Sequence, residues 1–201
     1  MGIPVLIIGE SGSGKSTSMR NFEPDELGIF NVAGKPLPFR KKLPKADNAT
    51  YQMIYKVLKE PQKKIYVIDD SQYLMAFESF DHAKESGYGK FTNMALNFRN
   101  LIDYIVRGTP SDCIVYLLHH TEIGENGRLK AKTLGKMLDN QLTLEGLFSI
   151  VLLCQVEGSE HFFITNSDGS NPAKSPMDMF EMKIDNDLKM VDSAIREYYE
   201  I

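Results

Sequence analysis

The sequence predicts an α/β fold in which a mainly parallel sheet carries helices on both faces. Apolar runs of strand length alternate along the chain with segments of helical periodicity. The apolar runs are also rich in Ile, Val, Leu and aromatic residues, which is typical of strands buried on both faces. At 201 residues the chain has the length of one domain, so residues 1–201 are expected to fold as a single unit.

The expected elements follow from these patterns in chain order. Two helices are indicated by apolar residues that recur every three or four positions, over Phe91–Ile105 and Leu188–Tyr198. Shorter helices are expected directly after Lys15 and over residues 71–80. The strands are expected at residues 3–8, 27–33, 64–69, 113–118, 148–156 and 161–165. Long polar connections, typical of functional or mobile loops, occupy residues 34–45, 120–136 and 166–176.

Composition narrows the class of protein. With 23 basic and 27 acidic residues the net charge is −4, so any binding to nucleic acid requires a local basic patch. Cys113 and Cys154 lie inside apolar runs without a CxxC partner, which favours buried thiols in a reducing compartment. No apolar stretch approaches the ~20 residues of a membrane span, and no basic leader precedes the first apolar run. A cytoplasmic protein without membrane contact is expected.

A glycine-rich segment directly follows the first expected strand. It reads GESGSGKST and matches GxxxxGK[ST] at every fixed position. Glycines let backbone N–H groups converge on phosphate oxygens, and the helix start that follows presents its positive end to them. We therefore expect a nucleoside triphosphate site in which Lys15 contacts the β- and γ-phosphates and the Ser16 hydroxyl ligates Mg²⁺. The expected nucleotide-binding residues are Gly9, Glu10, Ser11, Gly12, Ser13, Gly14, Lys15, Ser16 and Thr17.

Two adjacent carboxylates follow a second buried strand, in YVIDDSQ. Phosphoryl transfer needs a metal-orienting carboxylate at such a strand end, and Asp69 is expected to hold Mg²⁺ through water. Asp70 stands where many ATPases place the acid that orients the attacking water. The alternative for both residues is that they cap the helix expected over residues 71–80, because Asp is favoured at that position.

A third strand, CIVYLL, ends in polar residues. In many P-loop ATPases a polar residue at the tip of the strand beside the phosphate loop senses the γ-phosphate, and His120 or Thr121 is expected to do so here. The alternative is an ordinary polar strand end. No further Cys or His is spaced to complete a zinc site.

With these segments in this order, the chain resembles the P-loop ATPases with a RecA-like core that bacteriophages encode, a group that includes AAA-domain and phage nucleotide-binding proteins. The segments GKPLP, KTLGKMLD and SDGSNPAKSP contribute to the resemblance. It implies a three-layer P-loop NTPase with ATP as its nucleotide, bound by Gly12, Gly14, Lys15, Ser16 and Thr17, with Asp69 on the metal side. Some members are associated with single-strand annealing and homologous recombination. The resemblance also implies the host cytoplasm and a homo-oligomer with ATP at its subunit interfaces.

Two further expectations come from comparing the chain with this family pattern. RecA-like assemblies commonly insert a Lys or Arg from a neighbouring subunit into the ATP site, and Lys174 in PAKSP is the candidate; the alternative is a solvated surface lysine. RecA-type recombinases also place a catalytic glutamate after the second strand, where this chain reads IFNVAGK. Either Asp70 or Glu122 replaces that glutamate, or hydrolysis is slow.

The leading functional hypothesis is an ATPase that acts on single-stranded DNA in recombination, repair or replication. It depends on two basic segments, Lys35–Lys45 and Arg128–Lys136, in which Phe39 is a candidate for stacking on a base. The alternatives are a nucleotide-dependent switch or helicase-loader-like protein that acts on another phage replication or recombination protein, and a small-molecule kinase. The kinase is disfavoured because arginine is scarce after Arg107. The expected DNA contacts are Arg40, Lys41, Lys42, Arg128, Lys130 and Lys132.

Overall fold

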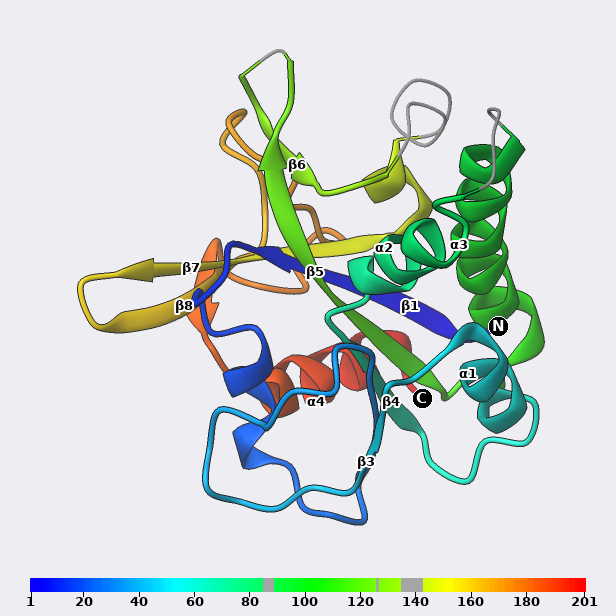
Figure 1. Cartoon of the computed structure of the whole chain (residues 1–201). Coiled ribbons are helices and arrows are strands. Elements are labelled where there is room, and N and C mark those ends of the chain that lie inside the picture. The colour runs from blue at the N-terminus through cyan, green and yellow to red at the C-terminus, as the bar shows by residue number, and fades with distance from the viewer. Residues whose placement is uncertain (85–88, 126, 135–142) are drawn as a thin grey trace.

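A mixed, mainly parallel β-sheet forms the centre of the molecule (Figure 1). The structure, a computed structural model, describes residues 1–84, 89–125, 127–134 and 143–201. Within these residues the sheet has nine strands in the order β3-β2-β4-β5-β1-β7-β8-β9, with β6 paired to the end of β5. The strands are β1 (Ile3–Gly9), β2 (Leu27–Asn31), β3 (Lys45–Asp47), β4 (Ile65–Asp69), β5 (Ile114–Ile123), β6 (Leu129–Ala131), β7 (Ile150–Glu157), β8 (Glu160–Ile164) and β9 (Lys183–Asp185).

Strand β1 lies between β5 and β7 and pairs with both in parallel. Gly9 at its end is opposite His120 of β5, and Ile8 is opposite Leu153 of β7. On the other side of β5, strand β4 pairs with β2 so that Asp69 is opposite Asn31. The carboxyl ends of these strands therefore meet along one edge of the sheet, while β6, β8 and β9 add antiparallel pairs outside this arrangement.

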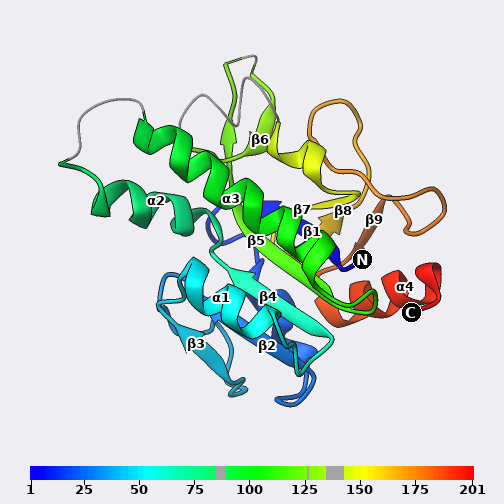
Figure 2. The same ribbon diagram turned by 90° about the vertical axis from the view of Figure 1, so that its right-hand side faces the viewer.

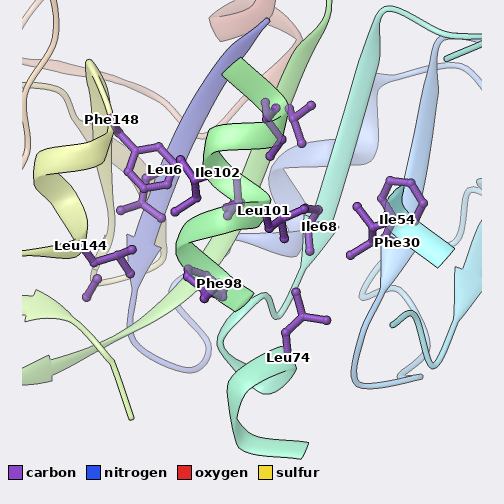
Figure 3. Packing of buried hydrophobic residues seen from close by; sticks show 14 of the residues in the cluster. Leu6, Phe30, Ile54, Ile68, Leu74, Phe98, Leu101, Ile102, Leu144 and Phe148 are labelled. Atoms are coloured by element: carbon purple, nitrogen blue, oxygen red, sulfur yellow. The ribbon is translucent and has the colours of Figure 1, made fainter. Parts of the chain in front are cut away.

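Helices cover both faces of the sheet, which makes three layers (Figures 1 and 2). Helices α1, α2 and α3 pack on one face, and η1 and α4 pack on the other, each side with its own hydrophobic cluster. Helix α3 directs Phe98, Leu101 and Ile102 into the first cluster, which also contains Leu6 and Ile68 of the sheet (Figure 3). The helices are η1 (Ser16–Asn21), α1 (Tyr51–Leu58), α2 (Gln72–Asp81), α3 (Gly89–Gly108), η3 (Leu144–Leu147) and α4 (Leu188–Tyr199).

The predicted α/β class, the mainly parallel sheet and the helices on both faces are confirmed, and all six expected strands are present. Strands β3, β6 and β9 were not predicted, because three residues are too few for a periodic pattern. Helix α1 was also missed, although Thr50 caps it by accepting a hydrogen bond from Met53 N–H. The helix expected after Lys15 is a six-residue 3₁₀ helix. No helix in the described ranges is long and apolar enough to cross a membrane.

A buried polar network attaches α4 to the sheet. Tyr116 of β5 is fully buried, and its hydroxyl donates to Asp192 Oδ1 at 2.9 Å. Arg196, one turn further along α4, donates from Nε to Asp192 Oδ2 at 2.7 Å and from Nη1 to the carbonyl of Asp112 at 2.9 Å. Asp192 is therefore the shared acceptor of a buried hydroxyl and a partly buried guanidinium.

Replacing Asp192 by Ala is expected to destabilise the protein by about 3 kcal/mol, because the Tyr116 hydroxyl and the Arg196 guanidinium both lose their acceptor in a buried place. Urea unfolding at neutral pH measures this loss. The control is Glu197→Ala, which removes an exposed carboxylate from the same helix and should change stability by less than about 0.5 kcal/mol. Equal stability of the two variants would contradict this account of the network.

Candidate functional site

Residues Gly9–Thr17, which we call the glycine loop, connect the end of β1 to η1. Two of its glycines have positive φ, +82° at Gly12 and +104° at Gly14, a region that other residues rarely adopt. At Gly14 a Cβ atom would also lie 2.9 Å from the ring of His161. The spacing of glycines in the sequence therefore matches positions where this backbone requires them.

Lys15 is held inside the glycine loop. Its Nζ donates to the carbonyls of Gly9 and Glu10, both at 2.8 Å, and the residue is almost completely buried. Burial lowers the pKa of Lys15, while Cys154, Asp70 and Asp69 raise it. The loop thus surrounds one buried cationic group.

Ser16 and Asp69 meet at the sheet edge. The Ser16 hydroxyl donates to Asp69 Oδ1 at 2.8 Å, across a separation of 53 residues in the sequence. Burial raises the pKa of Asp69, and the hydrogen bond from Ser16 lowers it. A hydroxyl oxygen and a carboxylate oxygen in contact are the hard donors that Mg²⁺ prefers, so these two side chains fit the ion that the sequence predicts.

Asp70 is paired with two basic side chains. Its Oδ2 lies 2.6 Å from Lys35 Nζ, and its Oδ1 lies 3.3 Å from His120 Nε2. Burial favours the neutral acid, but the hydrogen bonds from His120 and Lys35 outweigh it and lower the pKa of Asp70 to about 2. Helix α2 has Ser71 at its N-cap and no side-chain capping bond. The capping alternative for Asp69 and Asp70 is therefore wrong.

An open pocket joins the glycine loop to these carboxylates. It brings together the expected residues Lys15, Ser16, Asp69, Asp70 and His120. Sequence reasoning did not assign Lys35 or His161 to the site, because neither belongs to a local motif of the nucleotide site. The full lining is Ser11, Gly12, Gly14, Lys15, Ser16, Thr17, Lys35, Pro36, Pro38, Asp69, Asp70, His120 and His161.

Side chains from β7, β8 and the segment before α4 brace the glycine loop at Ser13. The Ser13 carbonyl accepts from Cys154 Sγ at 3.1 Å and from His161 Nδ1 at 2.7 Å. Asn186 donates in turn to Cys154 Sγ at 3.2 Å. Cys154 and Cys113 are buried and free, as expected, and burial raises the pKa of both thiols to about 11. Cys154 therefore supports the loop as a hydrogen-bonding side chain.

Of the expected nucleotide-binding residues, Gly9, Glu10 and Ser13 belong to the glycine loop but do not line the pocket. The site candidates Glu122, Thr121 and Lys174 also lie outside the lining. Glu122 pairs with Lys130 at 3.2 Å, so of Asp70 and Glu122 it is Asp70 that lines the pocket. Of the two candidates at the end of β5, His120 lines the pocket and Thr121, whose Oγ1 is buried, does not. Lys174 is joined to Val151 by a backbone bridge. Its role in a neighbouring subunit's site stays a prediction.

The two basic segments proposed for DNA binding approach each other beside Tyr73. Lys35 Nζ lies 5.3 Å from the centre of the Tyr73 ring, and Lys132 lines a pocket with Tyr73 and His120. The β5–β6 hairpin otherwise extends away from the loop after β2 (Figures 1 and 2). Lys41 pairs with Glu23 at 2.9 Å, and the partly buried ring of Phe39 packs against the second hydrophobic cluster. The stacking of Phe39 on a base stays a prediction. Lys136 lies outside the described residues. The expected contacts Arg40, Lys42, Arg128 and Lys132 are exposed.

A scan against known protein families found no family that matches the chain, and a search of curated proteins found no matching protein. The resemblance to phage P-loop ATPases therefore depends on the residues quoted above.

His119 supports the edge of the site from inside the core. It is fully buried, donates from Nε2 to the carbonyl of Lys132 at 2.7 Å, and accepts at Nδ1 from the Ser71 hydroxyl at 2.8 Å. Burial lowers the pKa of His119 to about 4, so the folded protein holds it neutral.

The unfolded chain binds a proton at His119 near pH 6.5, and the folded chain does so only near pH 4. Stability from this residue is therefore complete above pH 6.5 and falls as the pH is lowered towards 4, by about 2 kcal/mol at pH 5. Urea unfolding at pH 7.5 and pH 5 should show a smaller pH effect in His119→Gln than in the wild type. The control, His82→Gln at an exposed histidine, should keep the wild-type pH effect. An unchanged pH effect in His119→Gln would contradict the prediction.

Proposed function

We propose that this protein binds a nucleoside triphosphate with Mg²⁺ and hydrolyses its β–γ phosphoanhydride bond, with ATP as the nucleotide that the resemblance favours. The observation that carries the proposal is the hydrogen bond from Ser16 to Asp69 on the pocket that also contains the buried Lys15. The position of β5 between β1 and β4 supports it further, because His120 of β5 is opposite Gly9 of β1 and lies 3.3 Å from Asp70, which directly follows β4. A P-loop NTPase with a RecA-like core accounts for this combination.

The glycine loop and Lys15 provide the phosphate site in this proposal. Lysine Nζ carries three N–H donors, and two of them bond to the carbonyls of Gly9 and Glu10. The third donor is left for a phosphate oxygen. Ser16 and Asp69 would hold Mg²⁺, which when bound neutralises charge on the β- and γ-phosphates.

Asp70 is the residue that we assign to the attacking water. It lines the pocket, and the low pKa of its carboxyl makes it an anion at neutral pH. A carboxylate accepts a hydrogen bond from water and so directs the water oxygen towards the γ-phosphorus. The new bond joins that oxygen to the γ-phosphorus, the bond from phosphorus to the bridging oxygen breaks, and one proton of the water passes to an oxygen of the transferred phosphate. The products are the nucleoside diphosphate and inorganic phosphate.

Nucleotide binding and phosphate release test the proposal directly. Lys15→Ala should weaken Mg-ATP binding by about one to two orders of magnitude, because it removes a charged donor to the phosphates. Asp69→Asn should lower the hydrolysis rate about 10²-fold. The control is Lys56→Ala, an exposed lysine on α1 that should behave as the wild type. Failure of the wild-type protein to bind any nucleoside triphosphate would overturn the proposal.

The same assay separates the modes of action that the sequence left open. In an ATPase that acts on single-stranded DNA, turnover rises when the DNA is added, and Arg40→Ala, Lys41→Ala and Lys42→Ala together reduce the rise. In a nucleotide-dependent switch, ATP binds but turnover stays slow with or without DNA. The measurement without DNA is the first to perform, because it tests nucleotide turnover independently of any DNA contact.

A further inference from the structure

We propose that Lys35 is a second phosphate-binding cation, supplied by the same chain, which contacts the γ-phosphate and makes the site prefer triphosphates to diphosphates. This inference rests on the proposed function. It concerns the position just past β2, where the family pattern has a catalytic glutamate and this chain has Gly34-Lys35.

The fold places Lys35 at the site. Because Asn31 at the end of β2 is opposite Asp69, the chain leaves β2 directly beside the carboxylates. The Asn31 side chain donates to the Lys35 carbonyl at 2.7 Å, and Gly34 turns the backbone with φ +67°. A side chain at Gly34 would also meet Asn48 at 2.5 Å, so the turn is closely packed. These contacts therefore fix the position of the Lys35 backbone beside the carboxylates.

The Lys35 amine faces the same pocket as Lys15. The lining of this pocket thus carries two lysines together with the carboxylates of Asp69 and Asp70. An anion placed between the two lysines is attracted by both of them. In the proposed function this anion is the triphosphate group of the bound nucleotide.

The contacts of Lys35 allow it to change partner. Its side chain is 57 % exposed, and it is paired with Asp70 at 2.6 Å on the wall of the pocket. The ring of Tyr73 lies 5.3 Å from its Nζ. Because a lysine has a flexible four-carbon stem and three donors, Nζ can bond to a γ-phosphate oxygen within the pocket.

A different role for Lys35 would be only to neutralise Asp70, which would otherwise repel the triphosphate. The two roles predict different results when Asp70 is made neutral. If Lys35 contacts the γ-phosphate directly, Lys35→Ala still weakens binding in the Asp70→Asn background. If Lys35 only neutralises Asp70, Lys35→Ala has no effect there, because the asparagine at that position carries no charge.

The experiment measures the affinities of a non-hydrolysable ATP analogue and of ADP, both with Mg²⁺. Lys35→Ala should weaken binding of the analogue about tenfold and of ADP less than about twofold, since only the triphosphate has the γ-phosphate. In Asp70→Asn the additional change Lys35→Ala should again cost about tenfold for the analogue. The matched control is Lys64→Ala, which removes a 67 % exposed lysine paired with Asp112 at 2.9 Å, and it should leave both affinities unchanged.

The outcomes distinguish this inference from the proposed function. If the wild type binds both ligands and Lys35→Ala keeps the wild-type ratio of affinities, the Lys35 inference is overturned and the proposed function stands. Loss of the Lys35 effect in the Asp70→Asn background would also overturn the inference, because it assigns the effect to Asp70. If the wild type binds neither ligand, the proposed function itself fails.

Discussion

Parallel hydrogen bonding of β1 to β5, and of β5 to β4, is the constraint on which the site depends. In parallel pairs all strands end at the same edge of the sheet, so whatever follows each strand is brought to one place. The glycine loop begins at the end of β1, and Asp69 is the last residue of β4. His120 is the last residue of β5 that pairs with β1. The hydrogen bond between Ser16 and Asp69 joins the segment after β1 to the end of β4 across this edge.

Each charged group at this edge has polar or charged partners within the protein. Lys15 is buried and satisfied by two loop carbonyls, Asp69 is buried and bonded to a hydroxyl, and Asp70 is kept ionised by two basic partners. Burial makes an unpaired charge costly, so these contacts stabilise the arrangement of the site. The same burial strengthens the interactions among these charges, because charges interact more strongly in a medium of low dielectric constant.

The glycine loop has different neighbours on its two sides. On one side, Cys154 and His161 bond to the Ser13 carbonyl from strands that belong to the sheet. On the other side, the loop after β2 contributes an exposed lysine that contacts Asp70 and the ring of Tyr73.

The sequence by itself determined the features that depend on local chemistry. Apolar runs predicted the six longer strands, and the glycine spacing predicted a loop whose Gly12 and Gly14 need positive φ. Helix α1 and the three-residue strands carried too little local pattern to be predicted.

Only the tertiary structure decided which distant side chains meet. In the folded chain Asp70 pairs with Lys35 and does not cap α2, and Glu122 pairs with Lys130. Phe39 packs against the second hydrophobic cluster, and His161 bonds to the glycine loop. Each of these contacts joins residues on different elements, so its free energy depends on the register of the sheet. No local pattern encodes that register.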